Sequence, residues 1–162
     1  MLSLLKPPFR GGGSIASYDE NNAINKTNIS AFEAGSPNVA GILGMAAGIK
    51  YMNDYDDFEA RKDLCEFAYN ELSKLDNIEF FSKPRDGNVI FRLKGFASQD
   101  VVSYLGHKNV ILRSGKHCAH YLFNSMNIQD TIRMSFGIYN NKEDVLKAVD
   151  LIKNGGDFID GL

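Results

Sequence analysis

The chain carries at residues 111–119 the sequence Ile-Leu-Arg-Ser-Gly-Lys-His-Cys-Ala, in which a short apolar run leads through a glycine to a cysteine. The basic side chains of Arg113, Lys116 and His117 lie close in sequence to this cysteine, Cys118. The thiolate form of cysteine is the nucleophile, and neighbouring cations favour it. The stretch therefore predicts a reactive cysteine on a loop after a strand, with an inert cysteine as the alternative.

The same stretch resembles the loop R-x-G-x-H-C-A of type II cysteine desulfurases, the SufS-like and selenocysteine-lyase-like branch of the class V aminotransferases. Four further segments resemble that family in the same order. They are residues 7–14 (P-P-x-x-G-G-G-S), 32–38 (F-E-A-G-[ST]-P-N), 133–135 (R-A-S) and 139–144 (Y-N-[ST]-x-E-[ED]). The resemblance extends from about residue 7 to residue 152 and so covers nearly the whole chain.

The family resemblance implies an α/β fold, the C-terminal small domain of a fold-type I transferase that depends on pyridoxal phosphate. In this fold, helices lie on a small, mainly antiparallel sheet as a two-layer sandwich. Residues 1–36 correspond to the end of the large domain and a connecting loop, and residues 37–56 to an interdomain helix. Residues 57–162 correspond to the small domain with the cysteine loop.

The activity implied by the resemblance is cysteine desulfurase, with selenocysteine lyase as the near neighbour. Such an enzyme uses pyridoxal 5′-phosphate to convert L-cysteine into L-alanine and leaves a persulfide on Cys118 for iron–sulfur cluster assembly. The resemblance also implies a homodimer and a SufU-like or SufE-like sulfur acceptor. The family's Schiff-base lysine stands in an S-x-H-K context upstream of the P-P-x-x-G-G-G-S segment, and no lysine here has that setting. We therefore expect a C-terminal portion that is inactive alone.

Three further residues receive a role from the resemblance. Arg133 corresponds to the residue that binds the substrate carboxylate, Arg113 to a second arginine at the site, and Ser36 to the residue that reaches the cofactor phosphate across the dimer interface. A guanidinium pairs bidentately with a carboxylate, and a hydroxyl at a helix start suits a phosphate. From the residues alone, an exposed strand arginine, a loop-stabilising arginine and a bare helix cap remain as alternatives. Gln99 stands where some relatives carry a histidine that engages a zinc-bearing acceptor.

Hydrophobic periodicity and turn residues predict the order of the elements. Helices are expected over residues 37–53, 57–75 and 98–105 and after Asn141, strands over 14–18, 78–82, 88–94, 110–113 and 131–138, and a loop over 19–30. Ser36 is expected to cap the first helix, with Pro37 at its first position. Gly155 and Gly156 are expected to end the last helix.

Two side chains have a predicted orientation within these elements. Apolar residues alternate with polar ones over residues 131–138, so Arg133 is expected to point away from the core. The helix over residues 57–75 has an apolar stripe that includes Phe58 and Cys65, which predicts a structural core cysteine at position 65.

Composition excludes several other classes of protein. The chain has 162 residues, 44% hydrophobic content and a net charge of −2, which suits a compact domain and gives no electrostatic footprint for nucleic acid. Residues 1–5 are too short for a signal peptide and residues 39–49 too short to span a bilayer. Two cysteines without a C-x-x-C motif indicate a reducing compartment and no metal site. We expect the cytoplasm, or an organelle stroma after removal of a targeting sequence.

Two other functions remain compatible with these observations. The chain could be a sulfur-relay or partner-docking module that carries Cys118 without a cofactor site of its own. It could also be a structural fragment with no activity.

Overall fold

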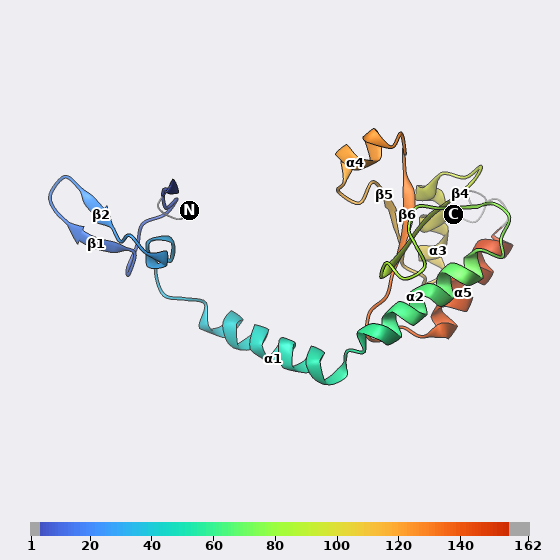
Figure 1. Cartoon of the computed structure of the whole chain (residues 1–162), viewed down its shortest axis with the longest axis horizontal. Helices are drawn as coiled ribbons and strands as arrows, with labels where there is room; N and C mark the ends of the chain where they lie inside the picture. Colours follow the sequence, from blue (N-terminus) through green and yellow to red (C-terminus); the bar gives the residue numbers. More distant parts are fainter. Residues whose placement is uncertain (1–3, 156–162) are drawn as a thin grey trace. The chain divides into compact units, whose positions relative to one another are not determined.

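The computed structural model describes residues 4–155, and the chain forms two compact units, Met1–Asp54 and Tyr55–Leu162 (Figure 1). The first unit contains an antiparallel pair of strands, β1 (Ile15–Tyr18) and β2 (Ala23–Asn25). The predicted loop over residues 19–30 is therefore wrong, because β2 lies within it and a short 3-10 helix, η2 (Ile29–Phe32), begins before its end. The carboxylate of Asp19 accepts hydrogen bonds from the backbone of the next turn, which reverses the chain and lets β2 pair with β1.

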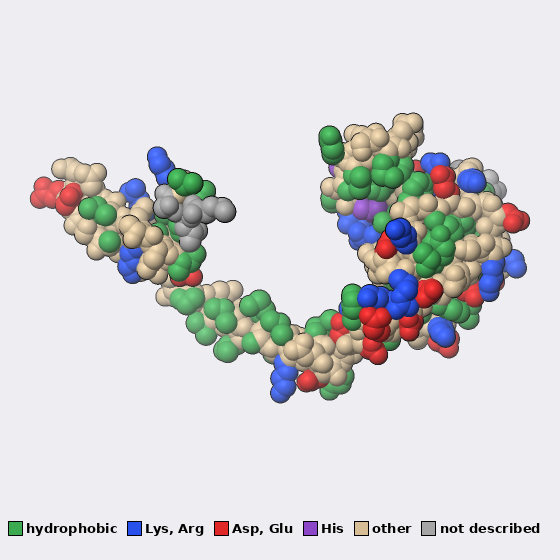
Figure 2. Space-filling model, in the orientation of Figure 1, with side chains coloured by type: hydrophobic (Ala, Val, Ile, Leu, Met, Phe, Trp, Pro, Cys, Tyr) green, Lys and Arg blue, Asp and Glu red, His purple; other side chains and the backbone are tan. Residues whose placement is uncertain are grey.

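Helix α1 (Val39–Tyr55) follows, and its capping residue differs from the expected one. The backbone N–H of Gly41 donates to Oδ1 of Asn38 at 2.9 Å, so Asn38 caps the helix in place of Ser36. A Cβ at Gly41 would lie 2.6 Å from the Asn38 side chain, which explains the glycine there. No residue of α1 is buried, and Figure 2 shows hydrophobic side chains along it.

The second unit is built on a four-stranded sheet in the order β3-β4-β6-β5, with every neighbouring pair antiparallel. The strands are β3 (Ile78–Phe80), β4 (Asn88–Leu93), β6 (Thr131–Ser135) and β5 (Arg113–Gly115). Helices α2 (Phe58–Leu72), α3 (Ser98–His107) and α5 (Lys142–Asn154) share one core with the alternate residues of β4 and β6. Since that core lies on one face of the sheet, the predicted two-layer α/β sandwich is confirmed.

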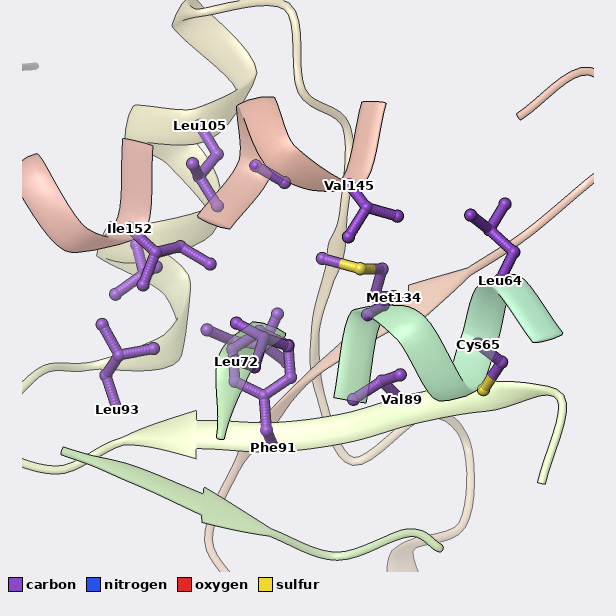
Figure 3. Close-up of a cluster of buried hydrophobic side chains, with 14 residues drawn as sticks. Leu64, Cys65, Leu72, Val89, Phe91, Leu93, Leu105, Met134, Val145 and Ile152 are labelled. Atoms are coloured by element: carbon purple, nitrogen blue, oxygen red, sulfur yellow. The ribbon is translucent and has the colours of Figure 1, made fainter. Parts of the chain in front are cut away.

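The core is formed by aliphatic and aromatic side chains that point toward one another between the helices and the sheet (Figure 3). The residues labelled in the figure are Leu64, Cys65, Leu72, Val89, Phe91, Leu93, Leu105, Met134, Val145 and Ile152. Cys65 has no exposed surface, which confirms it as a core residue. Phe58, however, is 57% exposed and carries Arg61 and Lys62 against its ring, so its predicted place in the buried stripe is wrong.

Several element boundaries follow from contacts that periodicity does not reveal. β5 begins at Arg113, three residues after the predicted start, because only Arg113–Gly115 lies opposite β6 in register. The preceding apolar residues Val110 and Leu112 pack against the core without joining the ladder. Helix α4 (His120–Ser125) was not predicted. Asn141 caps α5 as expected, with a reciprocal bond to Asp144. Gly155 ends α5, and Gly156 lies outside the described residues.

Candidate active-site cysteine loop

Cys118 lies in a tight turn, residues 116–119, between β5 and α4. The turn closes with a hydrogen bond of 2.8 Å from the backbone N–H of Ala119 to the carbonyl oxygen of Lys116. Its two central residues, His117 and Cys118, have φ angles of 51° and 64°. Positive φ at both central positions is the pattern of a type I′ turn, which normally selects Asn-Gly. Non-glycine residues held there cost on the order of 1–3 kcal/mol each, and such strain clusters at functional sites.

Three contacts on neighbouring elements hold this strained turn. The ammonium group of Lys116 donates to Oδ1 of Asn124 on α4 at 2.6 Å. The imidazole of His117 lies with Nε2 2.9 Å from Oγ1 of Thr131 on β6. The same ring meets Phe123 in a T-shaped arrangement, with 5.9 Å between ring centroids. The sulfur of Cys118 therefore has a defined position although the residue is exposed.

The sulfur also has a cationic partner. A guanidinium N–H of Arg113, at Nη2, donates to Sγ of Cys118 at 3.3 Å. Arginine keeps its charge at any physiological pH, and a hydrogen bond from it stabilises negative charge on the acceptor. The geometry thus places a permanent positive charge against the sulfur of Cys118.

Arg133 lies directly opposite Arg113 in the pairing of β5 with β6. Its neighbours in the strand, Ile132 and Met134, are buried in the core, so Arg133 lies on the sheet face away from the helices, as predicted. Like charges directly opposite each other destabilise a sheet. Within residues 4–155 neither arginine has an acidic partner, and Nε of Arg133 is buried without a hydrogen bond. Two adjacent guanidinium groups without a carboxylate form a site suited to an anion.

His117 completes this cluster as a neutral side chain. Burial lowers the pKa of the imidazole below its ordinary value of 6.5, and the charges of Arg133 and Arg113 lower it further. At neutral pH the imidazole of His117 therefore carries a proton on only one of its two ring nitrogens. Nδ1 is buried and has no hydrogen-bond partner among the described residues.

Ser36, the remaining predicted site residue, belongs to the first unit, whereas Cys118, Arg113 and Arg133 belong to the second. Ser36 is exposed and stands two residues before the cap of α1. It lines an open cleft of about 680 Å³ together with Lys26 and Ser30. The cleft thus offers hydroxyl donors and one ammonium group, and Glu33 with its carboxylate also lines it.

Sequence reasoning missed two contacts of the cysteine loop. The first is the buried Thr131, whose hydroxyl meets His117. The second is Gln99 on α3, whose Oε1 accepts a hydrogen bond of 2.6 Å from Ser114 on β5. The sequence carries no local signal for Thr131, because β6 alternates polar with apolar residues and Thr131 is one of its polar positions.

Within residues 4–155, no helix has the length and apolar character needed to cross a bilayer. The same range contains no grouping of three or more His, Cys, Asp or Glu side chains able to hold a metal ion.

Comparison with known proteins places this geometry in a family. The family model of class-V aminotransferases matches residues 1–147. A cysteine desulfurase of Haloferax volcanii is 34% identical over 158 residues, 94% of this chain and 37% of that protein. A probable cysteine desulfurase of Staphylococcus aureus (strain COL) is 32% identical over 165 residues, 98% of this chain and 40% of that protein.

Solved structures give the same result. The crystal structure of the cysteine desulfurase CsdA of Escherichia coli superposes with a TM-score of 0.83 at 28% identity, over 94% of this chain and 39% of that chain. The apo cysteine desulfurase of Thermococcus onnurineus has a TM-score of 0.77, also at 28% identity, over 96% of this chain and 40% of that chain. The chain thus spans about two fifths of the length of these relatives. Its sequence and its fold agree that the chain belongs to the class-V aminotransferase family.

Proposed function

We propose that this chain is the part of a pyridoxal-phosphate-dependent cysteine desulfurase that carries the sulfur-accepting cysteine. L-cysteine is converted to L-alanine, and its sulfur remains as a persulfide on Cys118 for iron–sulfur cluster assembly. One observation carries the proposal: the exposed sulfur of Cys118 stands on a strained turn with Arg113 3.3 Å away. The names of the relatives support the same activity.

The proposed step uses the sulfur of Cys118 as nucleophile. The thiolate attacks the sulfur of the substrate cysteine, an S–S bond forms, and the bond between that sulfur and the substrate Cβ breaks. The carbon takes up a proton and leaves as the methyl group of alanine, so the transferred sulfur is oxidised and the carbon reduced. Arg113 stabilises the negative charge of the attacking sulfur.

The two arginines also suit the substrate carboxylate. Arg133 has a buried Nε–H without a partner in the described structure, and Arg113 lies opposite it on β5. A carboxylate accepts two parallel hydrogen bonds from one guanidinium, and it would relieve the repulsion between the two cations. We therefore assign carboxylate binding to Arg133, with Arg113 as the second arginine of the site.

The residues of the first unit fit one end of pyridoxal phosphate. Ser36, Ser30 and Lys26 line one cleft, and hydroxyl and ammonium donors suit a phosphate group. When bound, the cofactor withdraws electrons from the substrate carbon. The Schiff-base lysine is not in this chain. The nearest sequence match, Lys108 after His107, has Leu105 where the motif has serine, and its ammonium lies over the ring of Tyr104.

Domain organisation and assembly follow from the same proposal. Residues 1–36 end the large domain, residues 37–56 form the interdomain helix, and residues 57–162 form the small domain. Helix α1 has exposed apolar side chains, such as Leu43 at 66% exposure. They support the proposal that other parts of a homodimeric enzyme cover this helix. A cytoplasmic location and a SufU-like or SufE-like acceptor belong to the proposal as well.

A chimera tests the proposal. This chain replaces the matching part of Escherichia coli CsdA, and alanine release from L-cysteine is measured together with the mass of the Cys118 peptide. We expect turnover and one added sulfur atom on Cys118. Cys118→Ala should abolish both while the visible absorbance of bound cofactor remains. A cofactor-loaded chimera that works equally well without Cys118 would refute the sulfur-accepting role.

Arg133 is tested in the same chimera. Arg133→Ala should lower kcat/KM by the equivalent of about 2–4 kcal/mol, since a bidentate carboxylate pair is lost. Lys153→Ala, at an exposed position of α5, is the matched control for loss of a cation in the same unit. Equal values of kcat/KM for the two variants would show that Arg133 is a strand residue without a role in substrate binding.

A further inference from the structure

Thr131 lies at the start of β6, where the sheet meets the cysteine turn. The residue has no exposed surface, and it pairs with Gly115, the last residue of β5. Its hydroxyl oxygen lies 2.9 Å from Nε2 of His117 and 3.3 Å from the carbonyl oxygen of Gly115. One buried hydroxyl thus connects the end of the strand to the tip of the turn.

The hydrogen-bond donors and acceptors of Thr131, Gly115 and His117 decide where the protons lie. A threonine hydroxyl has one proton, and the Gly115 carbonyl is an acceptor only. If the hydroxyl donates to Gly115, it must accept from His117, which requires the proton on Nε2 and leaves Nδ1 with a lone pair. The other tautomer turns the hydroxyl to Nε2, removes its bond to Gly115, and places an N–H at Nδ1, where residues 4–155 provide no acceptor. A buried donor without a partner is rarer than a buried acceptor without a partner. The first arrangement, with the proton on Nε2, is therefore favoured.

The charges around the ring keep it in the neutral state that this arrangement needs. Arg133 on β6 and Arg113 on β5 both act against protonation of His117, in addition to its burial. Within the turn itself, Lys116 and Cys118 are the adjacent titratable side chains, and the ammonium group of Lys116 bonds to Asn124. The ring contact from α4 is the uncharged Phe123. No carboxylate among the described residues pairs with either arginine to offset these charges.

We propose that Thr131 is a positioning residue, which holds His117 as the Nε2–H tautomer and thereby keeps Cys118 beside Arg113. His117 and Cys118 are adjacent and both have positive φ, so anchoring the ring restrains the strained turn that presents the sulfur. The positioning role follows from these contacts alone. Its consequence for sulfur transfer rests on the proposed function.

Nitrogen NMR of the imidazole tests the tautomer on the chain as it is, without cofactor. The His117 signals are assigned by their loss in His117→Gln. We expect a protonated Nε2 and an unprotonated Nδ1 at neutral pH. Thr131→Ser, which keeps the hydroxyl, should preserve this signature, and Thr131→Val, which has nearly the same shape, should lose it. A wild-type ring protonated at Nδ1 would overturn the proposal.

Alkylation of Cys118 tests the consequence for the sulfur. At neutral pH, Thr131→Val should slow the reaction with iodoacetamide about threefold to tenfold, the effect of losing one buried hydrogen bond. Thr131→Ser should recover most of the rate, and Thr27→Val, the same change at an exposed site, should leave it unchanged. Equal rates for the three variants and the wild type would show that Thr131 does not position the turn.

These measurements separate this inference from the proposed function. A chimera without desulfurase activity, together with the expected tautomer and alkylation rates, would refute the function and leave the positioning role intact. An active chimera that is indifferent to Thr131→Val, with an Nδ1–H ring, would refute the positioning role alone.

Discussion

At the scale of single residues, the two cysteines have opposite surroundings. Cys65 is fully buried between α2 and the sheet, and burial raises the pKa of its thiol. Cys118 is exposed on its turn beside Arg113. We expect iodoacetamide to modify Cys118 at neutral pH and to reach Cys65 only after unfolding, because alkylation requires an accessible thiolate. Mass mapping of labelled peptides measures this, and preferential labelling of Cys65 in the folded chain would contradict both assignments.

The lowered pKa of His117 makes stability depend on pH with a definite sign. In the unfolded chain the imidazole takes up a proton near its ordinary value of 6.5, whereas in the folded chain it does so only at lower pH. Between these two values the unfolded state binds more protons, so the free energy of unfolding decreases as the pH falls below 6.5. Above that value both states are neutral and the contribution is constant.

His117→Gln should remove this part of the pH dependence. Urea midpoints of wild type and variant, measured at about pH 7.5 and again at about pH 5.5, check the difference in slope. His120→Gln on exposed α4 is the matched control. An identical slope in His117→Gln and wild type would show that burial and the two arginines do not act on this ring.

At the scale of elements, α5 has the clearest local determinant. The Asn141 side chain accepts from the backbone of Asp144, and the Asp144 carboxylate accepts from the backbone of Asn141. Asn141→Ala should cost about 1 kcal/mol of the free energy of unfolding, as the loss of a helix cap does. Chemical denaturation measures it, with Asn70→Ala on the exposed side of α2 as control. Equal stabilities of the two variants would show that the capping box contributes little.

Local signals of this kind explain which elements the sequence predicts. The sequence predicts α2, α3, α5 and the alternation in β6, because these features depend on neighbours only a few residues apart. The start of β5 depends on its register with β6, and it was predicted three residues too early. β2 depends on the turn at Asp19, and no strand was predicted there. α4 has only six residues, too few for a periodic pattern.

The candidate site shows the same difference between features that depend on nearby residues and features that depend on strand pairing. Motif order predicted Cys118, Arg113 and Arg133 as candidate site residues, and the structure brings these three together on β5, β6 and the turn between β5 and α4. The anchor of the turn could not be predicted, because His117 and Thr131 are 14 residues apart in sequence and meet only through strand pairing. The cap at Asn38 was missed because Ser36-Pro37 is an equally good local start signal.

At the scale of the whole molecule, Gln99 bears on the sulfur acceptor that belongs to the proposed function. Its Oε1 accepts from Ser114 at 2.6 Å, and its amide lies 3.4 Å from the Ser103 hydroxyl, so both ends of the side chain are engaged. An amide oxygen is also a weaker zinc ligand than imidazole. We expect stimulation by a zinc-bearing acceptor to survive Gln99→Ala in the chimera. Alanine release with SufU-like and SufE-like acceptors measures this, and loss of zinc-dependent stimulation in the variant would show that Gln99 serves as the ligand.

The chain by itself is predicted to have negligible desulfurase activity. In the proposed function, Cys118 is the nucleophile and the two arginines form the carboxylate site, but no lysine of this sequence stands in the S-x-H-K setting that the family uses to bind the cofactor. Without that lysine the electron sink is not held against the substrate carbon, and the C–S bond stays intact. Alanine release from L-cysteine with added pyridoxal phosphate should therefore equal that of Cys118→Ala, since free cofactor and cysteine react slowly without any enzyme. Release well above that control would mean that the residues of this chain suffice to activate the cofactor.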